Sequence, residues 1–353
     1  MDLSGEASDA LTFYLNNYEM IFHYISSGQK RILGDSSNKQ CRFCERDQNQ
    51  VSFRKDAHAI SEFTGNKHLL VHYECDECNQ DFGEHLEDHF AKFIGFMRTN
   101  SQIRGKNGVP SYKSKNGKSR IDMGKAGLEI SVYLDDPIVD FNEKTEELVI
   151  NGHTQPFIPL SVFKALVKYG INLLPAAEVE NFRNTIKWIM DFDHDTSKKA
   201  GESPTEAMVL RQFVPGPMPF RRFEAALIRR KQKPVTNIVP YMFLLFGFGN
   251  YFYQVHLPYS DHDVHLRGEN IDLKHYPLSF YNRPEEYQPQ PHGTDLSSHE
   301  KIKGQEETLS FHVGNPRKAK EMVTEMKKKQ NSFIRKFKRG FRWLKEILTA
   351  PFT

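Results

Sequence analysis

The chain has 353 residues and a formal net charge of +3 at pH 7, and 38% of its residues are hydrophobic and 12% aromatic. This composition can build the hydrophobic cores of about two domains, and the charge by itself indicates no particular partner. The first ten residues, MDLSGEASDA, carry no secretory signal, and the longest strongly apolar stretch, Tyr241–Phe248, has 8 residues, against about 20 for a membrane span, so we expect a soluble, cytoplasmic protein with no membrane span.

The first predicted element is a helix over residues 8–27, followed by a link of thirteen residues, GQKRILGDSSNKQ. All the cysteines of the chain then fall into two Cys-x-x-Cys pairs with 30 residues between them. Intracellular thiols stay reduced, so a disulfide framework is not expected, whereas two such pairs are the usual ligands of a tetrahedral structural zinc ion. We therefore predict that one structural Zn²⁺ is bound by Cys41, Cys44, Cys75 and Cys78.

The segment between the pairs contains a predicted strand at residues 51–53, VSF, and then AHAI, which places His58 among small and apolar residues. A turn follows at TGN, residues 64–66. After the second pair, the spacing of Phe82, Leu86, Phe90 and Ile94 predicts an amphipathic helix. Asn79 lies at the expected start of this helix, where asparagine is also a favoured N-cap residue.

The order of these features resembles the zinc-knuckle HNH endonucleases, whose fold is the ββα-metal fold. The resemblance covers about residues 38–95 and rests on the four cysteines together with His58, Gly65, Asn66 and Asn79. It implies an α+β chain in which an N-terminal zinc-clamped ββα-metal domain, with its preceding helix, occupies residues 1–97. Ser61 stands where many members of the family have proline.

The resemblance also implies roles for three residues in phosphodiester hydrolysis. His58 would be the general base, because a neutral imidazole accepts a proton near pH 7. Asn79 would be a ligand of a catalytic Mg²⁺ or Mn²⁺ ion, and Asn66 would orient the loop and His58 by hydrogen bonds. Many relatives have Asp directly before the histidine as a second metal ligand, but here that position is Ala57. The candidates for this second ligand are Asp56, Glu62, His85 and Glu87.

Three further segments follow the nuclease-like region. Residues 98–125 contain eight Lys or Arg and one acidic residue, which predicts a loop or irregular hairpin, either a solvated linker or an arm that contacts phosphates. Residues 126–283 are predicted to form a mixed α+β domain: LEISVYL pairs with ELVING as strands, helices follow from residue 160, and YMFLLFGFGNYFYQVHLP forms a hairpin. Residues 284–353 are predicted to be a polar, mobile linker and a basic amphipathic C-terminal helix.

The function that these features favour is a metal-dependent HNH-type endonuclease acting on DNA, and the resemblance weakly implies a role in anti-phage defence. A second hypothesis is a zinc-knuckle nucleic-acid-binding module that has lost its catalytic activity, favoured by Ala57. A third is an effector nuclease whose second domain responds to a regulatory protein or a small-molecule activator.

Overall fold

The computed structural model describes residues 5–125, 127–133, 135–194, 207–216, 218–236, 238–266, 271, 273–282, 288–312 and 315–328. It contains two compact units. The first comprises Met1–Phe90 and Ile158–Lys301, and the second comprises Ala91–Phe157 and Ile302–Thr353. These bounds differ from the division at residues 97, 125 and 283 expected from the sequence, because the chain returns to the first unit at Ile158.

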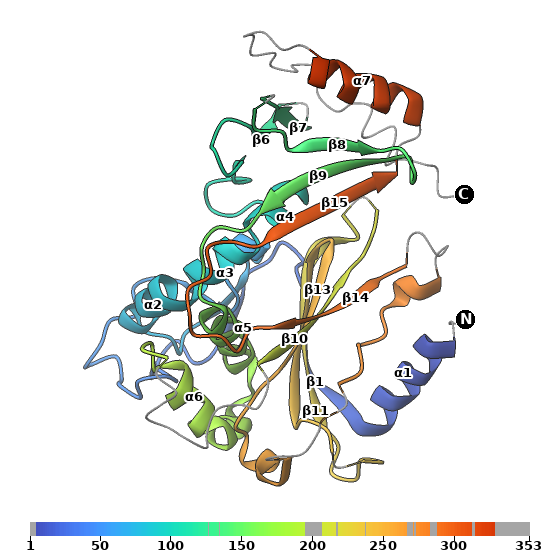
Figure 1. Ribbon diagram of the computed structural model, residues 1–353. Helices are drawn as coiled ribbons and strands as arrows, with labels where there is room; N and C mark the ends of the chain where they lie inside the picture. The colour runs from blue at the N-terminus through green and yellow to red at the C-terminus, as the bar shows by residue number, and fades with distance from the viewer. Residues whose placement is uncertain are drawn as a thin grey trace. The chain divides into compact units, whose positions relative to one another are not determined.

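A six-stranded antiparallel sheet forms the centre of the first unit (Figure 1). Its order is β1 (Tyr18–Ile25), β11 (Phe220–Arg230), β12 (Met242–Gly249), β13 (Tyr251–His256), β10 (Met208–Phe213) and β14 (Gln290–Asp295). The hairpin predicted around GFGN is confirmed as β12 and β13, with Phe248 opposite Tyr251.

Two predictions about the edges of this sheet are wrong. The helix expected over residues 8–27 ends early, because α1 is Gly5–Asn17 and the rest of that segment is β1. The sequence of β1, YEMIFHYI, is rich in aromatic and β-branched residues, and it pairs with β11 about two hundred residues later. At the opposite edge, β14 lies in the segment expected to be a mobile linker and pairs with β10 from Met208 to Phe213.

Each face of the sheet packs against helical structure, with α1 on one side and α5 on the other (Figure 1). On the first face, Tyr14 of α1 shares a hydrophobic cluster with Phe243 and Leu245 of β12. On the second face, the ring of Tyr169 in α5 lies 6.3 Å from that of Phe246. The backbone of α5 approaches this face closely, since a side chain at Gly170 would meet Leu257 at 2.4 Å.

Helix α5 (Pro159–Leu173) confirms the helix predicted after residue 160, but all fifteen of its residues are buried, not only one stripe. A helix covered on every side must pair each of its polar groups. Two of its buried side chains are lysines, Lys164 and Lys168, each 1% exposed. The helix predicted next is divided into two 3₁₀ turns, Ala176–Glu178 and Glu180–Phe182, and the short helix α6 (Arg183–Ile189).

The region between the cysteine pairs forms a small sheet in the first unit. Strand β4 (Leu69–Val71) lies between β2 (Arg31–Leu33), which is parallel to it, and β3 (Ala57–His58), which is antiparallel. Residues 51–53 are not a strand, contrary to prediction, and the hydroxyl of Ser52 bonds to Asp76 instead. Helix α2 (Asp76–Phe82), a π-helical turn (Gly83–Glu87) and α3 (Asp88–Phe93) follow, so the ββα order is β3, β4, α2.

The second unit contains two three-stranded sheets, β5–β6–β7 and β15–β9–β8, with helices α4 and α7. Its core combines Phe96 of α4 with apolar residues of both sheets and with Ala319 and Val323 of α7. The bounds of these elements are α4 Gly95–Asn100, β5 Tyr112–Lys113, β6 Arg120–Gly124, β7 Gly127–Ser131, β8 Val139–Asn142, β9 Glu147–His153, β15 Glu306–His312 and α7 Pro316–Lys328.

Three expectations bear on this unit. The basic segment 98–125 contributes β6 to a hairpin with β7, which was one of the two forms predicted for it. The predicted pairing of LEISVYL with ELVING is wrong, because LEISVYL contains β7, which pairs with β6, whereas ELVING belongs to β9, which pairs with β8. The first part of the basic C-terminal helix is confirmed as α7, whose Ala319 and Val323 are buried; residues 329–353 of that prediction lie outside the described residues. Across the part of the chain that the structure describes, no helix is long and apolar enough to cross a membrane.

The first prediction concerns Lys168, whose Nζ lies 2.9 Å from Glu74 and 3.0 Å from Glu87. Lys168→Met leaves these two carboxylates without a counter-charge in the interior, and we expect it to cost about 3–5 kcal/mol of unfolding free energy. Urea unfolding measures this loss.

The matched control is Lys164→Met, one helical turn earlier. Lys164 is equally buried, and its Nζ donates to the carbonyl oxygen of Asp191, at 2.5 Å. We expect a smaller cost, about 1–3 kcal/mol. An equal loss in the two variants would contradict the importance of the two carboxylates.

Candidate zinc centre and nuclease site

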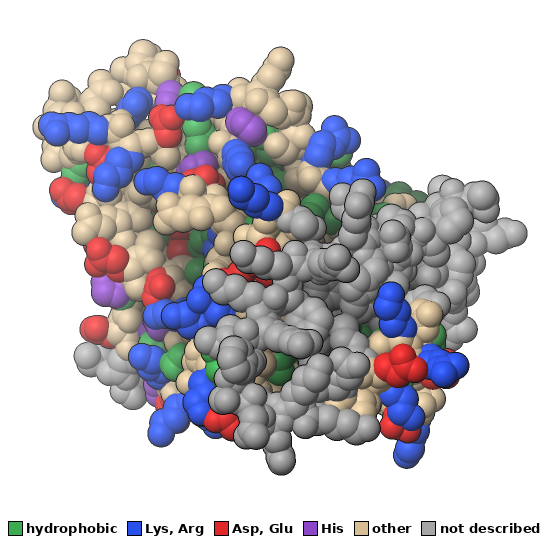
Figure 2. Space-filling model, turned by 90° about the horizontal axis from the view of Figure 1, so that it is seen from above, with side chains coloured by type: hydrophobic (Ala, Val, Ile, Leu, Met, Phe, Trp, Pro, Cys, Tyr) green, Lys and Arg blue, Asp and Glu red, His purple; other side chains and the backbone are tan. Residues whose placement is uncertain are grey.

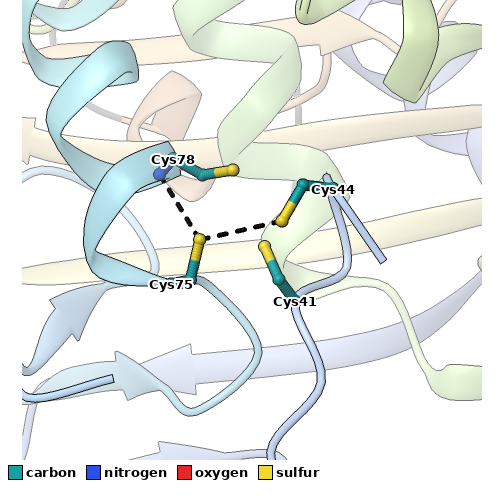
Figure 3. A group of neighbouring side chains, drawn as sticks. All are labelled: Cys41, Cys44, Cys75 and Cys78. Atoms are coloured by element: carbon teal, nitrogen blue, oxygen red, sulfur yellow. Dashed lines mark hydrogen bonds between the residues drawn. The ribbon is translucent and has the colours of Figure 1, made fainter. Parts of the chain in front are cut away.

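The four cysteine sulfurs converge from two elements of the first unit (Figure 3). Cys75 and Cys78 belong to the start of α2, and Cys41 and Cys44 belong to the loop that follows β2. All four sulfurs lie within 4.8 Å of one another. The sequence prediction that the two pairs form one cluster is therefore confirmed.

The geometry of the cluster suits a zinc ion. Zn–S bonds of about 2.3 Å in a tetrahedron imply sulfurs about 3.8 Å apart. The sulfurs of Cys44 and Cys75 are 3.8 Å apart. Arg46 donates a hydrogen bond to the sulfur of Cys44 at 3.4 Å and also binds Glu77. The guanidinium charge of Arg46 therefore stabilises negative charge on the Cys44 sulfur.

The chemistry of the four thiols also fits a cation. The Cys78 thiol donates a hydrogen bond to Cys41 and is the main reason why the pKa of Cys41 is lowered to about 5. Burial raises the pKa of Cys75 to about 12, and the contact with Cys41, followed by burial, raises that of Cys78. Without a cation the shifts therefore favour a thiolate at Cys41 and protonated thiols at Cys75 and Cys78, whereas a bound divalent ion would stabilise thiolates.

His58, the predicted general base, lies on β3 opposite Leu70 of β4. Its side chain is 26% exposed and its Nε2 lies 3.8 Å from the carboxylate of Glu62. Burial lowers its pKa below the ordinary value of 6.5, against the opposite effects of Glu62 and Glu87. The ring is therefore neutral at pH 7 and able to accept a proton.

The four candidates for a second metal ligand have different surroundings. Glu62 faces His58, and its side chain is 28% exposed. Asp56 forms an exposed ion pair with Lys30, and Glu87 binds Lys168. The ring of His85 stacks on Phe192, with centroids 4.8 Å apart. Among these candidates, Glu62 is the carboxylate that the structure brings to His58.

Asn66 is completely buried between β3 and β4 and uses both ends of its amide. Its nitrogen donates to the carbonyl oxygens of Ile60 and Leu69, at 2.6 and 3.0 Å, and its oxygen accepts from the amides of His68 and Leu69, at 3.3 and 3.0 Å. These bonds tie the loop after His58 to the next strand, and the orienting role of Asn66 stays a prediction.

Asn79 lies inside α2 and not at its N-cap. The N-cap is Cys75, whose sulfur accepts from the amide of Cys78, and the amide of Asn79 donates to the carbonyl oxygen of Cys75 at 2.9 Å. The capping role considered for Asn79 is therefore excluded, because its backbone is already helical. Its side chain is partly exposed, and its role as a ligand of a divalent ion stays a prediction.

The sequence did not indicate that α5 contributes to this site. Lys168 binds Glu74 and Glu87, while Asn172 donates to the carbonyl oxygen of Ala59 at 3.1 Å and to Glu74 at 2.8 Å. Burial by itself would lower the pKa of Lys168, but the two carboxylates outweigh it and raise that pKa. A charged lysine therefore joins α5 to the second cysteine pair and to the helical segment after it.

A solvent-open groove of ≈ 570 Å³ lies along the loop that leads to β3. Its lining includes two cations, Lys39 and Arg54, and three consecutive side-chain amides, Gln48, Asn49 and Gln50. Asp76 holds the end of this loop by accepting from the amides of Arg54 and Lys55, at 3.0 and 2.9 Å. The groove thus has a fixed polar wall close in sequence to His58.

Comparison with known proteins supports the resemblance found in the sequence. Residues 41–94 match the family model described as HNH endonuclease. The comparisons with curated proteins and with solved structures found no match. Helix α5, which begins at Pro159, lies outside the matched segment.

The second prediction concerns the metal. Because the four sulfurs converge to within 4.8 Å of one another, we expect the purified protein to contain one zinc ion per chain. Cys75→Ser should lose the ion and unfold at a lower temperature, because structural zinc contributes directly to folding. Elemental analysis and thermal unfolding measure both effects. A metal content far below one per chain with four freely reactive thiols would contradict it.

Proposed function

We propose that this protein is a metal-dependent endonuclease that hydrolyses phosphodiester bonds in DNA, with His58 as the general base. The observation that carries the proposal is the His58–Glu62 pair. A neutral, partly exposed histidine lies beside a carboxylate, on a strand joined through β4 to a four-cysteine cluster. The match of residues 41–94 to HNH endonucleases supports the same chemistry.

In the proposed reaction, His58 takes a proton from a water molecule, whose oxygen then attacks phosphorus. Asn66 fixes the loop after β3, and burial keeps the His58 ring neutral for this step. Asn79 and Glu62 are the residues that we propose would hold a divalent ion. When bound, such an ion would supply positive charge to the scissile phosphate.

Two sets of cations are candidates for contacts with the DNA backbone. Lys39 and Arg54 line the groove beside the loop to β3. In the hairpin of the second unit, Lys113 and Lys115 are exposed, whereas Lys118 and Arg120 form ion pairs with Asp135 and Asp122. Lys and Arg are interspersed with Asp and Glu on the face drawn in Figure 2. We therefore expect DNA affinity to depend on individual cations that are not engaged in ion pairs more than on a uniform positive potential.

A zinc-clamped module that binds nucleic acid without cutting it is the second candidate. It is favoured by Ala57, at the usual position of the second ligand, and by the engagement of Asp56 with Lys30. Regulation by a protein or small molecule through residues 126–283 stays a proposal for either candidate. A plasmid-cleavage assay with Mg²⁺ or Mn²⁺ distinguishes the two, since the binding module retards DNA and leaves it intact.

The third prediction concerns His58. His58→Ala should abolish plasmid cleavage while changing DNA affinity little, because a general base acts in the transition state. In the wild type, cleavage should decline with acidification only below pH 6.5, because the pKa of His58 is lowered from that value. His23→Ala, an exposed histidine on β1, is the control and should cut normally. Normal cleavage by His58→Ala would refute the assignment.

The fourth prediction concerns the hairpin. Lys113→Glu together with Lys115→Glu should weaken DNA binding and flatten the log–log salt dependence by about 0.9 for each DNA phosphate that is no longer neutralised. The matched control reverses Lys301 and Lys303, which are also exposed and two residues apart, and should change affinity less. Equal effects of the two double reversals, measured by fluorescence anisotropy across salt concentrations, would show a response to net charge only.

A further inference from the structure

The turn that follows His58 is held in an extended conformation at Ser61. Its φ is −51° and its ψ is 139°, and the 3₁₀ turn Glu62–Thr64 begins directly after it. This φ lies within the range that a proline ring imposes. The backbone of Ser61 also forms a hydrogen bond with the hydroxyl of Tyr169 in α5. The conformation of this residue determines where Glu62 is presented to His58.

The hydroxyl of Ser61 is fixed from two directions. It donates to the carboxylate of Glu87 and accepts from the hydroxyl of Tyr169 at 2.8 Å. A serine hydroxyl has one hydrogen to donate, so this pair of bonds leaves it a single orientation. Ser61 is 5% exposed and Tyr169 is fully buried, which reduces competition from water for these bonds.

Helix α5 also controls the other partner of Ser61. Lys168, adjacent to Tyr169, lies 3.0 Å from Glu87 and therefore orients the carboxylate that accepts from Ser61. One turn later, Asn172 binds the carbonyl oxygen of Ala59 at 3.1 Å. Tyr169 and Asn172 of one helix thus reach the two ends of the segment from residue 59 to residue 61, and Lys168 reaches Glu87, which accepts from Ser61.

We propose that α5 is a working part of the nuclease site, in which Lys168 and Tyr169 are positioning residues that hold Glu62 against His58 through Glu87 and Ser61. This inference rests on the proposed function of His58. A proline at position 61 would fix φ through its ring. In this chain, hydrogen bonds from α5 fix the conformation of residue 61 instead. The site is therefore completed by a helix outside the segment that matches the HNH endonucleases.

Two small substitutions test this without removing a buried charge. Ser61→Ala and Tyr169→Phe each delete one link, and each should lower kcat roughly tenfold with KM changed less than about twofold, because they misplace a catalytic group. The double variant should lose about as much as either single one, since both act on one chain of bonds. Tyr18→Phe is the control, as it deletes a buried bond to the carbonyl oxygen of Pro240 on the central sheet.

A second measurement does not depend on cleavage. The amides of Thr64 and Gly65 donate to the carbonyl oxygens of Ser61 and Glu62, at 3.1 and 2.9 Å. Hydrogen exchange at these two amides should accelerate roughly tenfold or more in Ser61→Ala and Tyr169→Phe, because the turn opens locally. It should stay unchanged in Tyr18→Phe, and zinc content should be the same in all these variants.

Rescue separates positioning from general stability. Ser61→Pro fixes φ by its ring, so Ser61→Pro with Tyr169→Phe should regain kcat and slow exchange at Thr64 and Gly65, compared with Ser61→Ala with Tyr169→Phe. Unchanged kcat and exchange in Ser61→Ala and Tyr169→Phe, or no rescue by proline, would overturn the inference. If the wild type cuts no DNA, the proposed function fails, and the exchange rates alone decide whether α5 holds the turn.

Discussion

A buried lysine between two carboxylates is the interaction on which the arrangement of the first unit depends. Lys168 is 1% exposed and lies within 3.0 Å of both Glu74 and Glu87. Glu74 directly precedes the second cysteine pair, and Glu87 ends the π-helical turn after α2. Taking these charges out of water is costly, so they are stable there only together. Removing Lys168 leaves two carboxylates without a counter-charge.

The small ββα region is therefore supported from two sides. On one side the four cysteines join the loop after β2 to the start of α2. On the other side α5 contributes buried hydrogen bonds to Ser61, Ala59 and Glu74. A region of this size cannot build a large hydrophobic core, and such regions commonly need a metal or a further packing surface. Helix α5 supplies that surface and is itself covered by the central sheet.

Elements stabilised by neighbours in the sequence could be predicted, and those stabilised by distant partners could not. The β12–β13 hairpin follows from two apolar runs around one turn, and α5 follows from its own periodicity. In contrast, β1 is a strand because it pairs with β11, and β14 is ordered because it pairs with β10. Residues 51–53 have strand propensity, but Ser52 binds Asp76 and the residues around it face a groove.

For the site, the sequence by itself determined the four-cysteine cluster, because it depends on cysteines at fixed local spacing, and the resemblance to HNH endonucleases supplied the candidate roles of His58, Asn66 and Asn79. Only the tertiary structure decided that Glu62, rather than Asp56 or Glu87, lies beside His58. It also decided that Tyr169 reaches the turn after His58 and that Lys168 reaches Glu87, the other partner of Ser61. The physical reason is that a hydrogen bond or ion pair between side chains about one hundred residues apart leaves no periodicity in either segment. It exists because α5 is packed between the sheet and the ββα region, where each polar group must find a partner.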